Sequence, residues 1–174
     1  KERAEIQAVE DRALENEPAQ VVEGGYFEYT EQGRVIQALD AAVLTRKEST
    51  STEGSSEPTH WDVSGGFTLY IGGGRTTHDA TLTAIRGTYN EEASRLEAWE
   101  DVVLVNKEGE RLETEHLIWS HDSDLVRTDR PVAIFTAQGI LRGRGLTSDS
   151  RFERYNILAP TGSFDLGLDH SQTE

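Results

Sequence analysis

From Gly24 onward, the apolar residues follow no helical period. They occur in short runs rich in Val, Ile, Thr, Tyr and Phe, a pattern typical of β-strands. Turn-forming groups such as Gly72-Gly73-Gly74 and Lys107-Glu108-Gly109 separate the runs. The pattern therefore predicts an all-β chain, with strands near residues 26–30, 34–45, 61–71, 76–90, 95–106, 111–120, 124–135, 138–148 and 151–168.

The first residues follow a different pattern. Ile6, Val9, Ala13 and Leu14 recur at helical spacing among many charges, and Pro18 ends the stretch. We expect a short solvated helix or a disordered leader over residues 1–23, in preference to a helix that binds a partner. A single β-domain is predicted over 24–168, with a mobile loop over 49–58 that has no apolar residue and a flexible tail over 169–174.

The apolar positions also repeat. Leu82, Leu112 and Leu141 are 30 and 29 residues apart. In that register further positions coincide: Ala84 with Thr114 and Gly143, Tyr89 with Trp119, Leu96 with Val126, Leu117 with Leu146, Val102 with Val132, and Leu104 with Ile134. A structural repeat of about 30 residues cannot bury its apolar face alone, so it must stack on neighbouring repeats. We therefore predict an elongated roll of two facing sheets joined along one side, with unpaired strand edges at both ends that suit pairing with a similar protein.

Two segments, 102–105 and 131–135, are apolar at consecutive positions and therefore on both faces of a strand. Two interpretations remain open: an ordinary core with further contacts outside, or an interior left open along one side for a ligand. The tryptophans Trp61, Trp99 and Trp119 could line that interior, belong to the core, or form exposed platforms for sugars.

Charge and composition exclude several classes of function. Asp and Glu number 32 against 17 Lys and Arg, and the formal charge is −15, which argues against nucleic-acid binding through a basic face. The absence of cysteine excludes disulfides and thiolate chemistry. Methionine is absent even at position 1, so we expect the natural start, with a signal peptide or membrane anchor, to lie upstream.

Candidate catalytic groups are few. His116, His121, Asp122 and Asp124 cluster in the sequence and could bind a metal, but a polar strand end followed by an acidic turn explains them better. The segment 72–77 lacks the lysine and the following helix of a phosphate-binding loop, and no G-x-S-x-G motif occurs. We therefore expect no enzyme activity, no metal and no cofactor.

Three blocks of sequence resemble the LptC family. Residues 101–119 are similar to its valine-rich strand, Asn-x-x-Gly turn and Leu-x-Thr-Glu-x-Leu-x-Trp pattern. Thr128-Asp129-Arg130-Pro131-Val132 resembles its Thr-Asp-x-Pro-Val, and residues 143–149 resemble its Gly-x-Gly-Leu-x-x-Asp. The order and spacing agree over roughly residues 80 to 165, residues 33–44 fit loosely, and residues 1–23 and 49–58 match nothing in the family pattern.

The resemblance implies a twisted, open β-jellyroll, or β-taco, in the Gram-negative periplasm, tethered to the inner membrane by an N-terminal segment that residues 1–23 would follow. It implies a non-catalytic carrier that receives lipopolysaccharide from an inner-membrane ABC transporter and passes its acyl chains along a hydrophobic trough to an LptA-like bridge. The N-terminal edge would meet the transporter's own jellyroll, and the C-terminal edge would meet the LptA-like protein.

The repeat-aligned positions are our candidates for facing inward and binding lipid: Leu82, Ala84, Leu96, Val102, Leu104, Leu112, Thr114, Leu117, Trp119, Val126, Val132, Ile134, Leu141 and Leu146. Simple core packing is the alternative at each of them. For the whole chain, one alternative is a carbohydrate-binding or adhesive β-sandwich that uses exposed tryptophans. The other is a secreted hydrolase that uses His116, His121 or paired carboxylates.

Overall fold

The computed structural model describes residues 5–8, 20–47 and 60–164 of the chain. These residues form an all-β structure, and every strand pairing within it is antiparallel. The strands in chain order are β1 (Glu5–Ala8), β2 (Gln20–Glu31), β3 (Arg34–Lys47), β4 (His60–Ile71), β5 (Ala80–Ala84), β6 (Arg86–Asn90), β7 (Arg95–Asn106), β8 (Arg111–Ser120), β9 (Leu125–Thr128), β10 (Val132–Thr136), β11 (Gly139–Gly143), β12 (Gly145–Ser148), β13 (Tyr155–Leu158) and β14 (Thr161–Phe164).

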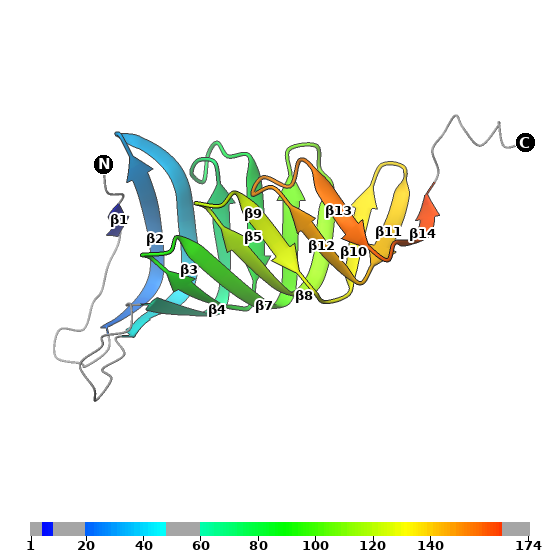
Figure 1. The fold of residues 1–174 in the computed structure, drawn as a ribbon. Helices are drawn as coiled ribbons and strands as arrows, with labels where there is room; N and C mark the ends of the chain where they lie inside the picture. The colour runs from blue at the N-terminus through cyan, green and yellow to red at the C-terminus, as the bar shows by residue number, and fades with distance from the viewer. Residues whose placement is uncertain (1–4, 9–19, 48–59, 165–174) are drawn as a thin grey trace, which may run out of the picture.

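The sheet folds back on itself into two layers. Layer A includes β5, β10, β11 and β14, and layer B includes β6, β9, β12 and β13. The long strands run through both layers: β4, for example, pairs with β6 through residues 60–63 and with β5 through residues 67–71. The result is an elongated, twisted body with β1 and β2 at one end and β14 at the other (Figure 1). We call the side where the strands bend between the layers the spine, and the opposite side, which carries the hairpin turns, the mouth.

The bends at the spine have local causes. In β4 the backbone turns at Gly65 and Gly66, whose φ angles of 76° and 99° favour glycine. In β7 the turn is made by Glu100 and Asp101, with φ angles of 73° and 53°, where the register with β8 shifts. Short breaks separate the other strands at this side, namely Ile85, residues 129–131, Arg144 and residues 159–160. Each bend sends one strand from layer A into layer B.

The predicted strands are confirmed over most of the described chain. The strands expected at 95–106 and 111–120 are β7 and β8 with the same bounds, and β3 and β4 agree within two residues. The strand expected at 26–30 is longer: β2 begins at Gln20, ahead of the predicted domain boundary at Gly24. The glycine-rich segment at 72–74 lies in the β4–β5 connection, as predicted.

Four of the predicted strands were too long, because each contains a break. The strand predicted over 124–135 is interrupted at residues 129–131, which include Pro131, a residue with no backbone N–H to donate. The strand predicted over 151–168 is broken at residues 159–160. It also starts later, because residues 151–154 form a turn in which the Asp149 carboxylate accepts hydrogen bonds from the backbone N–H groups of Glu153 and Arg154. The strands predicted over 76–90 and 138–148 are broken at Ile85 and Arg144, where they pass from one layer to the other.

The helical interpretation of the N-terminal residues is wrong for Glu5–Ala8. These residues form β1 and pair with Phe27–Thr30 of β2. The unpaired backbone groups of an edge strand offer hydrogen bonds along the whole segment, and such pairing overrides a weak helical preference. Residues 1–4 and 9–19, the loop predicted over 49–58 and the tail predicted over 169–174 lie outside the described residues, so these parts of the domain division stay predictions.

Over residues 5–8, 20–47 and 60–164, no helix is long and apolar enough to cross a membrane.

Candidate functional site

Alternating residues of layer A form a continuous apolar row. Side chains on one strand alternate between the two faces of the sheet, so residues paired across neighbouring strands share a face. Leu82 pairs with both Leu69 and Leu104, and the row continues through Leu112 to Ile134. It crosses layer A in the order Phe27, Leu39, Leu69, Leu82, Leu104, Leu112, Ile134 and Leu141. A continuous apolar strip therefore runs along the length of the body.

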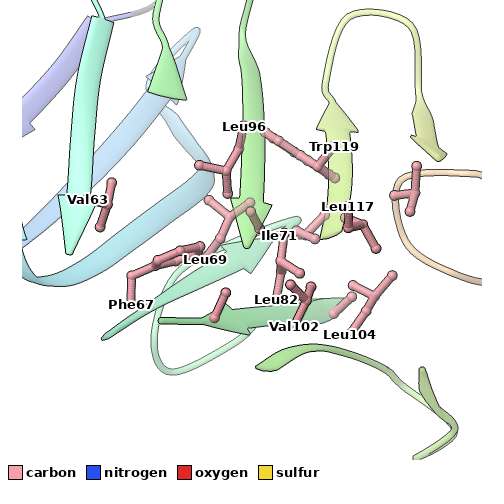
Figure 2. Packing of buried hydrophobic residues seen from close by; sticks show 14 of the residues in the cluster. Val63, Phe67, Leu69, Ile71, Leu82, Leu96, Val102, Leu104, Leu117 and Trp119 are labelled. Atoms are coloured by element: carbon pink, nitrogen blue, oxygen red, sulfur yellow. The ribbon is translucent and has the colours of Figure 1, made fainter. Parts of the chain in front are cut away.

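Layer B carries a second row on the facing side. Leu96 pairs with Trp119, which pairs with Val126, and Ala98 pairs with Leu117 in a parallel row nearer the spine. Side chains of both rows point toward one another across the space between the layers (Figure 2). The facing rows form the apolar interior, which is our candidate functional site.

The predicted inward orientation agrees with the burial of these residues. Thirteen of the fourteen candidates are buried, and Leu141, near the C-terminal end, is half-buried. The buried ones are Leu82, Ala84, Leu96, Val102, Leu104, Leu112, Thr114, Leu117, Trp119, Val126, Val132, Ile134 and Leu146. Thr114 is the one polar member, and its hydroxyl donates to the carbonyl oxygen of Pro131 at 2.9 Å. A role of these residues in binding lipid stays a prediction.

Several interior residues were not among the candidates. Most belong to β2, β3 and β4 at the N-terminal end, namely Val22, Phe27, Leu44, Val63, Phe67, Leu69 and Ile71. They lie before the clear repeats, so no register pointed to them, although period-two alternation within β4 could have done so. Phe152 is also fully buried but lies in a turn between charged residues, where no strand pattern applies.

The interior is closed in this structure, whereas an open lengthwise slot was expected. Leu104, Leu117 and Trp119 are 0% exposed. At the N-terminal end a cavity of about 30 Å³ lies between the layers, lined by residues that include Phe27, Trp61 and Tyr89. That volume holds one or two waters, not an acyl chain. Lipid could occupy the interior only if the layers separate.

Hydrogen bonds cross the mouth in the N-terminal half. The hydroxyl groups of Tyr29 and Ser94 lie 3.1 Å apart, and Gln37 Nε2 donates to the hydroxyl of Tyr89 at 3.1 Å. Burial, followed by the neighbouring hydroxyl of Tyr29, raises the pKa of Tyr89. This phenol is therefore uncharged at neutral pH and suited to a closed apolar environment.

An ion-pair group crosses the mouth farther along. Asp79, in the β4–β5 connection of layer A, lies 2.7 Å from Arg151 Nε of the β12–β13 turn in layer B. Its other carboxylate oxygen lies 2.9 Å from Lys107 Nζ. Burial acts to raise the pKa of Asp79, but the hydrogen bonds from Lys107 and Arg151 outweigh it, so the pKa is lowered. The carboxylate is thus held in its charged form between the two layers.

Beside this group, Asn106 connects the β7–β8 turn to the β12–β13 turn. Asn106 Nδ2 donates to the carbonyl oxygen of Phe152 at 2.7 Å, and Asn106 Oδ1 accepts from the backbone N–H groups of Glu108 and Glu110 at 3.1 and 3.0 Å. The Phe152 ring is completely buried and stacks on Tyr155, with ring centroids 4.7 Å apart. Beside the β7–β8 turn, the mouth is therefore closed by both polar and apolar contacts.

The structure does not support the expectation of exposed tryptophans. Trp119 is fully buried, and Trp61 and Trp99 are half-buried. The Trp99 ring is covered in part by the guanidinium of Arg86, 5.4 Å from the ring centroid, and lies 5.6 Å from the ring of His116. A flat aromatic platform for sugars is therefore not among the described features.

The histidines considered for hydrolysis have separate partners. His116 Nε2 lies 2.7 Å from the carboxylate of Glu97, whereas the ring of His121 lies against Trp119. The Asp124 carboxylate instead accepts hydrogen bonds from the Ser150 hydroxyl and backbone N–H. Within the described ranges, no three His, Asp or Glu side chains are arranged to hold a metal ion.

The comparisons with known proteins agree with the resemblance in the sequence. The family model described as "Lipopolysaccharide-assembly, LptC-related" matches residues 3–161, which is most of the chain. No curated protein matches the chain at a significant level.

Proposed function

Since the chain belongs to the LptC-related family of lipopolysaccharide-assembly proteins, we propose that it carries lipopolysaccharide with the acyl chains held between its two layers. The family acts in lipopolysaccharide transport in the Gram-negative periplasm and is associated with the inner membrane. We further propose that the lipid arrives from an inner-membrane ABC transporter and leaves toward an LptA-like bridge. An N-terminal segment would tether the protein to the membrane.

The continuous apolar row of layer A is the observation that carries this proposal. Its members lie side by side across eight strands, so an acyl chain could move along the body without leaving apolar surroundings. Burying an alkyl chain is worth about 0.8 kcal/mol per CH2 group. Sites of nearly equal apolar character allow such a chain to slide, since no single position binds it much more tightly than the next.

The negative charge of the chain supports binding of the lipid through apolar contacts. A net charge of −15 repels the phosphate groups of a polyanionic lipid, so attraction must come from the alkyl chains. This arrangement favours a lipid whose acyl chains lie inside the body and whose sugars and phosphates stay outside the mouth.

Both ends of the body suit pairing with similar proteins. Within the described residues, layer A ends in β1 and β14 and layer B ends in β13, each with one edge that has no partner strand. An open edge extends readily by strand addition. We propose that the N-terminal end meets the jellyroll of the transporter and that the C-terminal end meets the LptA-like protein.

Site-specific photocrosslinking tests the carrier proposal. A photoreactive residue at Leu104, which is 0% exposed, is compared with one at Val103, its outward-facing neighbour on β7. After incubation with lipopolysaccharide, we expect strong labelling of the lipid from position 104 and at least tenfold less from position 103. Equal labelling from both positions would show that lipid contacts the surface rather than the interior.

A further inference from the structure

The turn between β12 and β13 belongs to layer B and reaches across the mouth to layer A. Residues 149–154 lie on the same side of the body as the hairpin turns of layer A (Figure 1). Two contacts connect the layers here: Asn106 Nδ2 to the carbonyl of Phe152 at 2.7 Å, and Arg151 Nε to Asp79 at 2.7 Å. The Phe152 side chain is completely buried and belongs to the apolar interior.

The backbone of this turn is held in an uncommon conformation. Phe152 has a φ angle of 57°, which a residue with a large side chain rarely adopts. Asp149 holds the turn by accepting from the backbone N–H groups of Glu153 and Arg154, and Ser150 is fixed by Asp124. Surrounding contacts of this kind are what keep a strained residue in place. The contacts to layer A add to these, so releasing them would remove part of what holds the strained conformation.

We propose that residues 149–154 form a gate over the mouth, in which Phe152 occupies the place of an acyl chain while the protein is empty. The gate rests on the proposed carrier function. Lipid uptake through the mouth then requires the Asn106–Phe152 hydrogen bond and the Asp79–Arg151 ion pair to break, and the Phe152 ring to leave the interior. The gate keeps the apolar surface away from water until an acyl chain replaces the ring.

Asn106→Asp removes the hydrogen bond to the gate and keeps two of the hydrogen bonds of the turn that Asn106 also supports. The aspartate keeps the side-chain oxygen that accepts from Glu108 and Glu110, but it loses the N–H groups that donate to the Phe152 carbonyl and to the Glu110 carboxylate. Arg151→Gln removes the ion pair alone. Arg127→Gln, an exposed arginine on the outer face of β9, is the matched control for the loss of one positive charge.

A measurement without lipid tests whether these contacts hold the mouth closed. The chain has no cysteine, so Leu104→Cys supplies a single thiol inside the body. We expect a small maleimide to react with this thiol about threefold faster in the Arg151→Gln background and at least tenfold faster with Asn106→Asp. Arg127→Gln should leave the rate unchanged. Equal rates in all backgrounds, at unchanged global stability, would overturn the gate.

A second measurement separates the gate from the carrier function. In Asp79→Cys/Arg151→Cys the two positions are joined by a cleavable bifunctional maleimide, which holds the mouth shut. We expect lipid labelling from a photoreactive residue at Leu104 to fall at least tenfold and to return when the linker is cleaved. Undiminished labelling of the linked protein would overturn the gate but not the carrier function, because lipid would then enter through the ends. No labelling from position 104 in the unmodified chain would overturn the carrier function, whereas the maleimide rates would still report on the gate.

Discussion

Along each strand, successive residues face alternately the interior and the outer side of the sheet. Substitutions at neighbouring positions can therefore test the two faces separately. On β7, Leu104 is fully buried between the layers, whereas Val103 is half-buried on the outer face. The same contrast holds on β10 for Ile134 and Phe135, whose ring lies beneath the Arg111 guanidinium at 4.2 Å. Both segments that are apolar on two faces thus have one face in the interior, and the outward Phe135 is partly covered by a long polar side chain.

Leu104→Ala should lower the free energy of unfolding by about 2–5 kcal/mol, because it leaves a cavity in a closely packed interior. Val103→Ala, one position away, should cost about 1 kcal/mol or less. Urea denaturation of the two variants measures both values. Equal costs would show that Leu104 is not surrounded by packed side chains.

The pKa of Asp124 predicts how the stability of the folded protein changes at acid pH. Hydrogen bonds from the Ser150 hydroxyl and backbone N–H lower its pKa below the usual 3.8, against the opposing effect of burial. Its contribution to stability is therefore fully present above about pH 3.8, the value for the unfolded chain, and is lost as the pH falls through the lower pKa of the folded state. We expect Asp124→Asn to be less stable than the natural chain at pH 7.

The stability difference between Asp124→Asn and the natural chain should shrink as the pH falls below 3.8, because both side chains are then uncharged. Unfolding by urea between pH 7 and pH 2 measures it. Asp122→Asn, an exposed position in the same turn, is the control and should show no such convergence. A difference that stays constant down to pH 2 would contradict the stabilising role of the charge.

For single residues, the sequence pointed to the apolar row of layer A where apolar positions repeat along the chain. Leu82, Leu112 and Leu141 aligned in the sequence, and the structure places all three in the row along layer A. The pattern failed for Phe152, whose ring stacks on Tyr155 and whose carbonyl oxygen accepts a hydrogen bond from Asn106 of another turn. Contacts between distant turns leave no local pattern in the sequence.

At the scale of elements, the break between β11 and β12 shows why a glycine pair is needed. A Cβ atom at Gly143 would lie 2.7 Å from the carbonyl oxygen of Leu158 and would overlap Ile157. A Cβ atom at Gly145 would lie 3.0 Å from the carbonyl oxygen of Thr128. The two glycines of the Gly-x-Gly-Leu block therefore permit close approach of neighbouring backbone at the spine.

Gly143→Ala should lower the free energy of unfolding by about 1–3 kcal/mol, since the backbone of β13 must move away. Arg144→Ala, an exposed side chain between the two glycines, should change it by less than about 0.5 kcal/mol. Thermal and urea unfolding measure both. A neutral Gly143→Ala would show that β13 does not pack against this bend.

The strands were predictable because the period-two alternation of apolar and polar residues is a local pattern. The bends at the spine were not predictable. Ile85 and Arg144 interrupt strands that read as continuous in the sequence, since a strand that passes between layers keeps its apolar pattern on both sides of the bend. The strand β1 was also missed, because its pairing with β2 is decided by the free edge of the sheet rather than by its own residues.

At the scale of the whole molecule, two large apolar residues are exposed among the described residues, and they have different positions. Leu158 is 54% exposed on β13, the last strand of layer B, whereas Ile85 is 42% exposed at the spine between β5 and β6. If the C-terminal end pairs with an LptA-like protein, Leu158 lies near that interface and Ile85 does not.

Leu158→Asp should weaken binding of an LptA-like partner by about tenfold, which corresponds to roughly 1.4 kcal/mol. Ile85→Asp introduces the same charge far from the ends and should leave the affinity unchanged. Surface plasmon resonance with the purified partner measures both. Equal weakening by the two substitutions would count against a C-terminal interface.

The overall architecture followed from the repeat, but the closed state of the mouth did not. Stacked hairpins predicted two facing sheets with free edges, and the described strands have this arrangement. The sequence pattern does not encode whether the layers touch, because that depends on the volumes of facing side chains such as Leu104 and Trp119 and on bridges such as Asp79–Arg151.

Methyl NMR with a spin-labelled lipid tests the central claim most directly. Lipopolysaccharide that carries a nitroxide on an acyl chain is added to protein labelled at the methyl groups of Leu, Ile and Val. We predict strong broadening of Leu82, Leu104, Leu112 and Ile134, which face the interior, and little broadening of Val103 and Val105 on the outer face of the same sheet. Uniform broadening, or broadening of the outer face alone, would contradict an interior that carries acyl chains.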